Sequence, residues 1–343
     1  MIDFGAFGPT VNLLVFLAAA AAIAFAGVKL SVIADELADR TGMGEVVAGA
    51  LFVGVSTSLP GAITSISTAA QGFPELAIGN ALGGLTAQTL FIAVADAVYR
   101  RANLEHAAAT PVALSQGILF IALLTMALFG TVTAGLVTFG LHPVSVLLPV
   151  AYVAGLFLLR QIRNEGMWMV KQTDETREEE SDASESEDER SDRRLWGLFA
   201  LYAAITGIAG YGIGQSSIAL IGFTGMSQTL FGSTFTAIAN SLPELVTAVA
   251  AVRIGAVGLA VGDIIGGNAF DVLFLSAADF VSDGSIFQAA SSKDQATALI
   301  AMLMIALILF GMMKRVKRGI FNIGFESVGV FLLYGVSILV LVL

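Results

Sequence analysis

Residues 239–271 read ANSLPELVTAVAAVRIGAVGLAVGDIIGGNAFD, and a related stretch, STSLPGAITSISTAAQGFPELAIGNALGGLTAQ, covers residues 56–88. The two copies lie 183 positions apart, and their register holds without a gap as far as Asp96 and Asp279. The clearest matches are Ser58-Leu59-Pro60 with Ser241-Leu242-Pro243, Gly79 with Gly262, and Gly83-Gly84 with Gly266-Gly267. Such self-similarity at one fixed offset indicates an internal duplication.

The composition predicts a membrane protein. Of the 343 residues, 56% are hydrophobic and only 13% are charged, whereas a soluble domain carries about 25% charged residues. The chain has no cysteine, which excludes disulfides, thiolate metal sites and cysteine nucleophiles.

Ten stretches approach the length of about 20 apolar residues that a bilayer-spanning helix needs. They are Val11–Leu30, Val46–Ala70, Leu76–Val98, Val112–Gly130, Val137–Leu159, Leu195–Phe223, Phe231–Val252, Val257–Val281, Ala296–Met313 and Phe325–Leu343. Because each copy of the duplication holds five spans, the two copies face opposite ways across the membrane. The predicted fold is therefore an all-α membrane protein of ten transmembrane helices in two inverted five-helix repeats, an architecture typical of secondary transporters.

The hydrophilic segment between the halves divides the chain into residues 1–160, 161–194 and 195–343. Eleven acidic residues lie between Asp174 and Asp192, so we expect residues 161–194 to form an acidic, disordered linker. Fifteen of the seventeen basic residues fall in loops on one side of the predicted topology, and only Lys293 falls in a loop on the other. Since basic loops stay cytoplasmic, we expect a multi-pass cell-membrane protein with the acidic loop inside and both termini outside.

The repeated block also predicts broken helices. Pro60 and Pro243 cannot donate a hydrogen bond to the carbonyl groups four residues earlier. A carbonyl freed in this way needs a new partner inside a membrane. A bound cation is one such partner, and neighbouring hydroxyl groups are the other.

Glu244 and Asp271 are acidic residues in the middle of predicted spans. An ionisable residue at this depth is costly and therefore indicates a functional cavity. Carboxylate, amide and hydroxyl oxygens suit Ca²⁺, Na⁺ and Mg²⁺. Asp263 is either a third carboxylate of this site or a residue near the inner interface. The paired glycines Gly83, Gly84, Gly266 and Gly267 predict close helix packing.

Four further polar residues lie near the ends of the predicted spans or between them. We interpret Asp96 and Asp279 as interfacial residues rather than ligands. His106 and His142 have no metal-ligand partner at a useful spacing, so we interpret both as ordinary residues of connecting segments.

These motifs resemble the two α-repeats of the calcium/cation antiporter (CaCA) superfamily, and the chain is similar to its prokaryotic sodium/calcium exchangers. In that family each repeat carries Gly-Thr-Ser-Leu-Pro-Glu followed by a glycine- and asparagine-rich helix. The resemblance covers the whole chain. It implies alternating access, in which the first and sixth helices slide across the other eight.

Carried over by position, the resemblance implies a set of ion-binding residues. They are Thr57, Ser58, Gln88, Asn240, Ser241, Glu244 and Asp271. The chain departs from the family pattern at Gly61, which stands where the family has its first-repeat glutamate. Gln88 stands where it has asparagine or aspartate, and Asn240 where it has threonine. Gly84 and Gly267 replace serines.

Two carboxylates neutralise one divalent cation, whereas three Na⁺ in their place would leave net positive charge in a medium of low dielectric constant. We therefore predict a cation antiporter that exports Ca²⁺ against Na⁺. The alternatives are the same scaffold coupled to H⁺ or moving another cation such as Mg²⁺, and a cation sensor that does not transport.

The other function classes are disfavoured. An intramembrane aspartyl protease would need paired aspartates and a Gly-x-Gly-Asp signature, whereas this chain has Val261-Gly262-Asp263 after an alanine. We expect no enzyme activity, no cofactor, no nucleic acid and no protein partner. The expected partners are the lipid bilayer and inorganic cations.

Overall fold

The computed structural model describes residues 4–41, 54–171, 173, 191–317, 319 and 323–343, and it is helical nearly throughout. The α-helices are α1 (Pro9–Thr41), α3 (Val55–Ala69), α4 (Pro74–Val98), α5 (Leu104–Ala107), α6 (Pro111–Val132), α7 (Pro143–Glu165), α8 (Asp192–Thr224), α9 (Gln228–Phe231), α10 (Ala237–Asn240), α11 (Leu242–Ile254), α12 (Val257–Asp271), α13 (Leu273–Val281), α14 (Ser292–Lys314) and α15 (Phe325–Val342). Short 3₁₀ turns, η1 (Phe4–Ala6) and η4 (Ile286–Gln288), and a π-helical turn, η3 (Gly232–Thr236), complete the elements.

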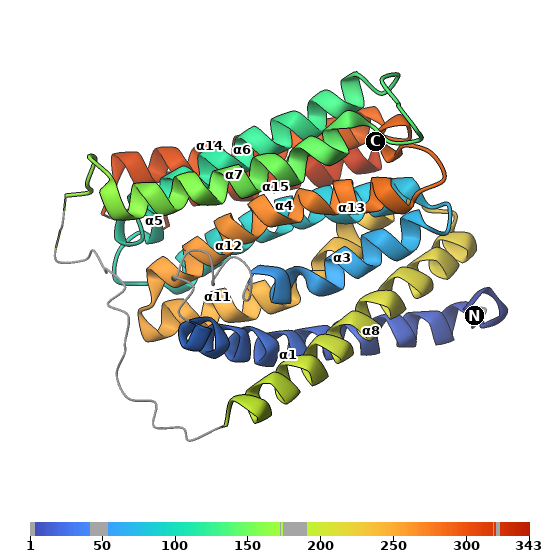
Figure 1. The fold of residues 1–343 in the computed structure, drawn as a ribbon, viewed down its shortest axis with the longest axis horizontal. Coiled ribbons are helices and arrows are strands. Elements are labelled where there is room, and N and C mark those ends of the chain that lie inside the picture. Colours follow the sequence, from blue (N-terminus) through green and yellow to red (C-terminus); the bar gives the residue numbers. More distant parts are fainter. Residues whose placement is uncertain (1–3, 42–53, 172, 174–190, 318, 320–322) are drawn as a thin grey trace.

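The predicted fold class is confirmed. Within the described residues, eight helices are long and apolar enough to cross a membrane, and the pair Gln228–Asn240 and Leu242–Ile254, bent by 46°, makes a ninth span. The remaining span is α3, whose predicted first residues, 46–53, lie outside the described part of the chain. Most of the predicted acidic linker, residues 161–194, also lies outside the described part of the chain. The proline-containing helices α3 and α11 run in opposite directions, as inverted repeats require (Figure 1).

The helices form three layers (Figure 1). Helices α6, α7, α14 and α15 form one outer layer, and α1 and α8 pack against each other in the opposite one. The central layer contains α3, α4, α11, α12 and α13. In α4, 78% of the most apolar stretch is buried, compared with 33% in α1 and α8.

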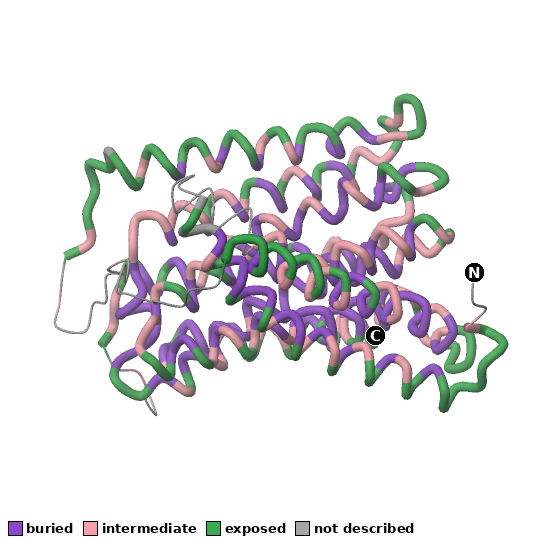
Figure 2. The backbone as a smooth tube through the Cα atoms, turned by 60° about the horizontal axis from the view of Figure 1, so that its bottom comes forward, coloured by how far each residue is buried: buried purple, intermediate pink, exposed green. Residues whose placement is uncertain are grey.

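The burial pattern agrees with a lipid-facing exterior. Buried residues concentrate in the central helices, and exposed residues concentrate on the outer ones (Figure 2). Large apolar side chains on the outer helices, such as Phe25, Phe157, Ile208 and Leu332, are more than half exposed. In water an apolar surface of this extent would be unfavourable, whereas lipid tails cover it without cost.

Candidate ion-binding site

A polar pocket lies at the break between α10 and α11, in the middle of the molecule. Side chains from both halves line it: Ser58, Gly61, Asn80, Ala81, Gly84, Gln88, Ala237, Asn240, Ser241, Glu244, Asp271 and Phe274. The break has a sequence cause. Ser241 leaves helical geometry at φ −97° and ψ 11°, and Pro243 then stands in the first turn of α11, where its missing N–H costs nothing. Pro243 therefore begins a new helix, whereas Pro60 lies inside α3.

Two carboxylates and one amide form the centre of the pocket. Glu244 and Asp271 are 7% and 2% exposed. Gln88 Nε2 donates to Asp271 Oδ2 at 2.7 Å and to Ser241 Oγ at 3.2 Å, so the amide links α4 to the second half. Gln88 and Asp271 are equivalent positions of the two repeats, because they too lie 183 residues apart.

Four buried oxygens around this pocket make no hydrogen bond of good geometry, although the Ser58 hydroxyl lies close enough to Asp271 to act on it. They are Ser58 Oγ, Gln88 Oε1, Glu244 Oε2 and Asp271 Oδ1. Buried polar atoms in proteins are nearly always hydrogen-bonded, and leaving one unsatisfied costs about 1–3 kcal/mol. A group of such oxygens on one pocket suits a ligand that accepts electron pairs, as a hard cation does.

A second set of polar side chains is already satisfied. Asn240 Nδ2 donates to Asn80 Oδ1 at 2.8 Å and to Thr64 Oγ1 at 3.0 Å. Asn80 Nδ2 in turn donates to the Gly61 carbonyl at 3.0 Å and to Ser65 Oγ at 2.8 Å. This amide network joins α3, α4 and α10. Asn240, predicted as an ion ligand, is thus engaged in holding helices together.

Two other predicted ligands do not line the pocket. Thr57 Oγ1 donates to the Gly54 carbonyl at 3.2 Å. Asp263 is exposed on α12, about two turns before Asp271, although its charge is close enough to act on Glu244. The fold brings together five of the residues carried over by resemblance, because all five line the pocket: Ser58, Gln88, Ser241, Glu244 and Asp271. Ser241 takes part through the hydrogen bond that its Oγ accepts from Gln88.

The position of the family's first-repeat glutamate is filled by an aromatic ring. A β-carbon at Gly61 would lie 3.0 Å from Phe274 Cε2 and 3.7 Å from its Cζ. The pocket thus has two carboxylates, both from the second half. Consistently, no group of three or more His, Cys, Asp or Glu side chains in the described ranges is arranged to hold a metal ion.

The four paired glycines serve different purposes. A β-carbon at Gly83 would lie 2.3 Å from Ser233 Cα, so this glycine permits a close crossing of α4 and η3. Gly266 faces the side chain of Gln116. Gly84 and Gly267 instead face the site, because β-carbons there would meet only Ser241 Oγ and Gln88 Oε1, each at 3.8 Å.

A further pair of glycines was not recognised in the sequence. A β-carbon at Gly210 in α8 would lie 2.4 Å from the Pro60 carbonyl oxygen, and one at Gly27 in α1 would lie 2.4 Å from Pro243 Cγ. These glycines also lie 183 residues apart. The repeat offset, extended beyond the matching block, would have found them. Asn80 lay within the block, but nothing in its pattern distinguished a network residue from a packing residue.

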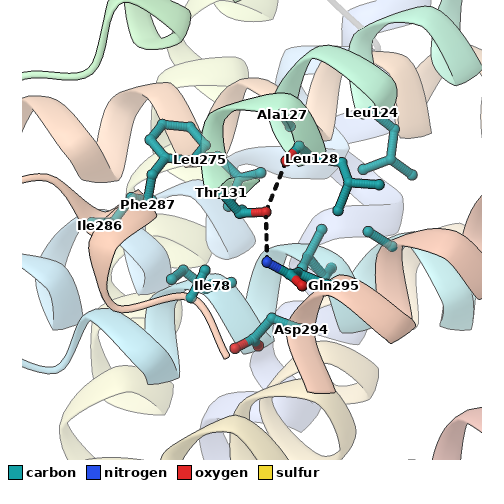
Figure 3. A pocket seen from close by; sticks show the side chains of 13 residues that line it. Ile78, Leu124, Ala127, Leu128, Thr131, Leu275, Ile286, Phe287, Asp294 and Gln295 are labelled. Atoms are coloured by element: carbon teal, nitrogen blue, oxygen red, sulfur yellow. Dashed lines mark hydrogen bonds between the residues drawn. The ribbon is translucent and has the colours of Figure 1, made fainter. Parts of the chain in front are cut away.

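An apolar hollow between α4, α6, α13 and α14 does not compete with this site. Figure 3 shows Gln295 Nε2 donating to Thr131 Oγ1, at 3.1 Å, and Thr131 in turn bonded to the Leu128 carbonyl. Asp294 caps α14 through Ser291 and leaves one unpartnered oxygen. Apart from Asp294, the polar side chains of the lining are Thr131 and Gln295, which bond to each other. One unpartnered oxygen does not form a cation site.

Known proteins share this fold and sequence pattern. The profile of the sodium/calcium exchanger protein family matches residues 11–159 and 194–343. The inner membrane protein YrbG of Escherichia coli is 27% identical over 299 residues, which cover 87% of this chain and 88% of YrbG. Two solved structures resemble the fold over 96% of this chain. The H⁺/Ca²⁺ exchanger CAX has a TM-score of 0.68 and 14% identity over 82% of its length. The sodium-calcium exchanger NCX_Mj has a TM-score of 0.59 and 18% identity over 98% of its length.

Proposed function

The chain belongs to the sodium/calcium exchanger family, and we propose that it exports Ca²⁺ in exchange for Na⁺. The observation that carries this proposal is the group of four unpartnered buried oxygens at the helix break. Glu244 and Asp271 supply two negative charges, which neutralise one divalent cation. Gln88 Oε1 and Ser58 Oγ add neutral ligands of the kind that Ca²⁺ accepts.

The coupling ion is the finer part of the proposal. One Ca²⁺ leaving the pocket is balanced by two monovalent cations at the same two carboxylates. A larger number of Na⁺ would need a third carboxylate, and Phe274 fills the place where the first repeat would supply it. This crowding favours, as a second candidate, exchange against H⁺ carried by Glu244 and Asp271 themselves. The H⁺/Ca²⁺ exchanger CAX is among the structures with this fold.

Alternating access would use the α1–α8 layer. These two helices are the first and sixth spans, they pack against each other, and each meets a site proline through a glycine. A small sliding motion of this pair would change contacts at Pro60 and Pro243 together. The amide network of Asn80 and Asn240 lies on the side of the site where α4 begins, and the exposed Asp263 lies on the other side.

The orientation follows from the positions of the basic side chains. Arg100 and Arg101 follow α4, Arg160 and Arg163 are in the last turns of α7, and Lys314 ends α14, all at the same end of the helices. We propose that this end is cytoplasmic, that both termini are outside, and that residues 1–160 and 195–343 are the two transport halves joined by residues 161–194.

Uptake into liposomes tests the proposal. Liposomes that contain the reconstituted protein are loaded with Na⁺ and diluted into Na⁺-free buffer that contains radioactive Ca²⁺. Liposomes loaded with K⁺, and liposomes with an imposed pH gradient, are measured in parallel. We expect uptake that needs internal Na⁺ and is lost in Glu244→Gln. Glu75→Gln, which changes a carboxylate outside the pocket at the start of α4, is the matched control and should transport normally.

Each other outcome contradicts a stated part of the proposal. Uptake driven only by the pH gradient would replace Na⁺ with H⁺ as the coupling ion. Normal Ca²⁺ uptake in Glu244→Gln would contradict the site. Absence of Ca²⁺ flux under both gradients would contradict Ca²⁺ exchange and favour another cation or a scaffold that binds without transporting.

A further inference from the structure

Three fully buried carboxylates meet at the end of the molecule opposite both termini. Asp96 lies near the end of α4, Glu105 in α5 and Glu326 in the first turn of α15, and each is 0% exposed. The prediction that Asp96 and Asp279 are interfacial is wrong, because both side chains are fully buried. Asp96 is also well bonded. It accepts hydrogen bonds from the Leu104 N–H at 2.7 Å, the Gly324 N–H at 2.9 Å and Ser327 Oγ at 2.8 Å.

The two glutamates are much less satisfied than the aspartate. Both carboxylate oxygens of Glu326 and Oε2 of Glu105 have no partner, and Glu105 Oε1 meets only Ser327 Oγ, at 3.2 Å. One oxygen of each glutamate faces a common point, because a β-carbon at Gly324 would lie 3.0 Å from Glu326 Oε2 and 3.2 Å from Glu105 Oε2. The other Glu326 oxygen, Oε1, lies against Gly311 of α14. Burial and the neighbouring carboxylates raise the pKa of Glu105 well above its usual range.

Among the described residues, the basic side chains near this point form no ion pair with the carboxylates, although the charge of Lys314 acts on Glu326. The Lys314 ammonium group lies over the Phe325 ring, 5.0 Å from its centre, and Arg315 donates to the backbone carbonyls of His106 and Lys171. Within the described part of the chain, none of the three carboxylates forms an ion pair.

The other half of the molecule has the same junction without the glutamates. Asp279 accepts hydrogen bonds from the Ile286 N–H, the His142 N–H and Ser145 Oγ, which repeats the three bonds of Asp96 one half later. Glu105 follows the donor Leu104, and Phe287 follows the equivalent donor Ile286. Glu326 precedes the donor Ser327, and Val144 precedes the equivalent donor Ser145. Phe287 and Val144 are both buried. Apolar residues therefore suffice to pack this junction, and folding alone does not require two buried glutamates.

We propose that Glu105 and Glu326 form a second site for a divalent cation, separate from the central pocket. A divalent cation can bind Oε2 of both glutamates together with Oε1 of the same Glu326 carboxylate, whereas a shared proton joins only two of these unpartnered oxygens. Two carboxylates match its charge, and water or backbone oxygens complete a flexible coordination shell of the kind Ca²⁺ accepts. Asp96 acts as a positioning residue, since its bonds hold the starts of α5 and α15 together.

The site would lie at the end that carries the basic residues, which the proposed orientation makes cytoplasmic. A cation bound there would join α5, which follows α4, to the start of α15. The occupancy of this site would therefore depend on the cation concentration on that side of the membrane. The binding itself does not rest on the proposed transport function.

Equilibrium dialysis of the purified full-length protein with radioactive Ca²⁺, and with Mg²⁺ as competitor, tests this site. The background is Glu244→Gln with Asp271→Asn, which removes the central carboxylates. We expect this background to retain one bound Ca²⁺ per chain. Adding Glu326→Gln or Glu105→Gln should weaken the remaining binding by more than about tenfold, whereas Asp283→Asn, an exposed carboxylate at the other end, should not.

A double substitution tests whether a loss of Ca²⁺ binding is caused by misfolding. Glu105→Phe with Glu326→Val installs the residues of the other half, so this variant should fold, with an unchanged elution volume and helical spectrum, and bind no Ca²⁺ in the background. A background that binds no Ca²⁺, or binding that survives these changes, would overturn the second site. Neither result depends on whether the wild-type protein transports.

Discussion

At equivalent positions of the two repeats, the second half carries Glu244 and Asp271 where the first half carries Gly61 and Gln88. The backbone features of the two halves are far more alike. Each half has a site proline met by a glycine of the first or sixth span, and each has an aspartate that accepts two backbone N–H groups and a serine hydroxyl. The comparison teaches that packing constrains both copies, whereas the ligands need to be present only once per pocket.

The largest expected effect on transport comes from the two carboxylates of the second half, compared with Gln88 of the first half. Glu244→Gln or Asp271→Asn should each lower Ca²⁺ transport about a hundredfold or more, because removing one buried charge from a compensated set costs about 3–5 kcal/mol. Gln88→Leu should cost less, about tenfold to a hundredfold, since it removes a neutral ligand and one hydrogen bond to a charged group but no charge. Initial rates of uptake in liposomes measure both. Equal losses would mean that the first half contributes as much as the second.

The next effect concerns the paired glycines. Gly210→Ala should lower the stability to unfolding by about 1–3 kcal/mol and slow exchange, because its β-carbon would meet the backbone of Pro60. Gly27→Ala should be milder, since it meets the side chain of Pro243. Gly222→Ala, also in α8 and with open space beside it, is the control. Thermal unfolding in detergent and uptake rates together test this, and a harmless Gly210→Ala would contradict the close approach.

A third test asks whether the missing carboxylate can be restored. Gly61→Glu alone should be destabilising by about 1–3 kcal/mol, because the new side chain would collide with the Phe274 ring. Gly61→Glu with Phe274→Ala should recover stability and increase the dependence of Ca²⁺ flux on Na⁺. The Phe274→Ala single variant is the control. Unchanged coupling in a well-folded double variant would show that the carboxylate count does not set the coupling ion.

The smallest expected effect compares the two aspartate junctions. Ser145→Ala and Ser327→Ala each remove a hydroxyl that donates to the buried aspartate, at a cost of about 1 kcal/mol. Ser327→Ala should cost somewhat more, since Ser327 Oγ also contacts Glu105. Thermal unfolding of both variants in the absence of divalent cations measures the difference. A larger loss of stability in Ser145→Ala would contradict a stabilising contact between Ser327 and Glu105.

Much of the site was predictable because it rests on local chemistry. An acidic residue within an apolar span must find a cavity, so the positions of Glu244 and Asp271 alone predicted that both line one, and both do. The roles of Asn240 and Thr57 were not predictable in this way, because an amide or hydroxyl in a span can serve an ion or a neighbouring helix equally well. Asn80 and Phe274 gave no signal that distinguished them from packing residues.

The sequence by itself determined the membrane location, the ten spans and the inverted duplication, because hydrophobic length and internal repetition are properties of the chain alone. Only the tertiary structure decided which oxygens stay unpartnered, since satisfaction depends on contacts between helices that lie far apart in the sequence. It placed Gln88 against Asp271 and Phe274 against Gly61. It also buried Asp96 with Glu105 and Glu326, although a position near the end of a span is compatible with the interface as well as with the core.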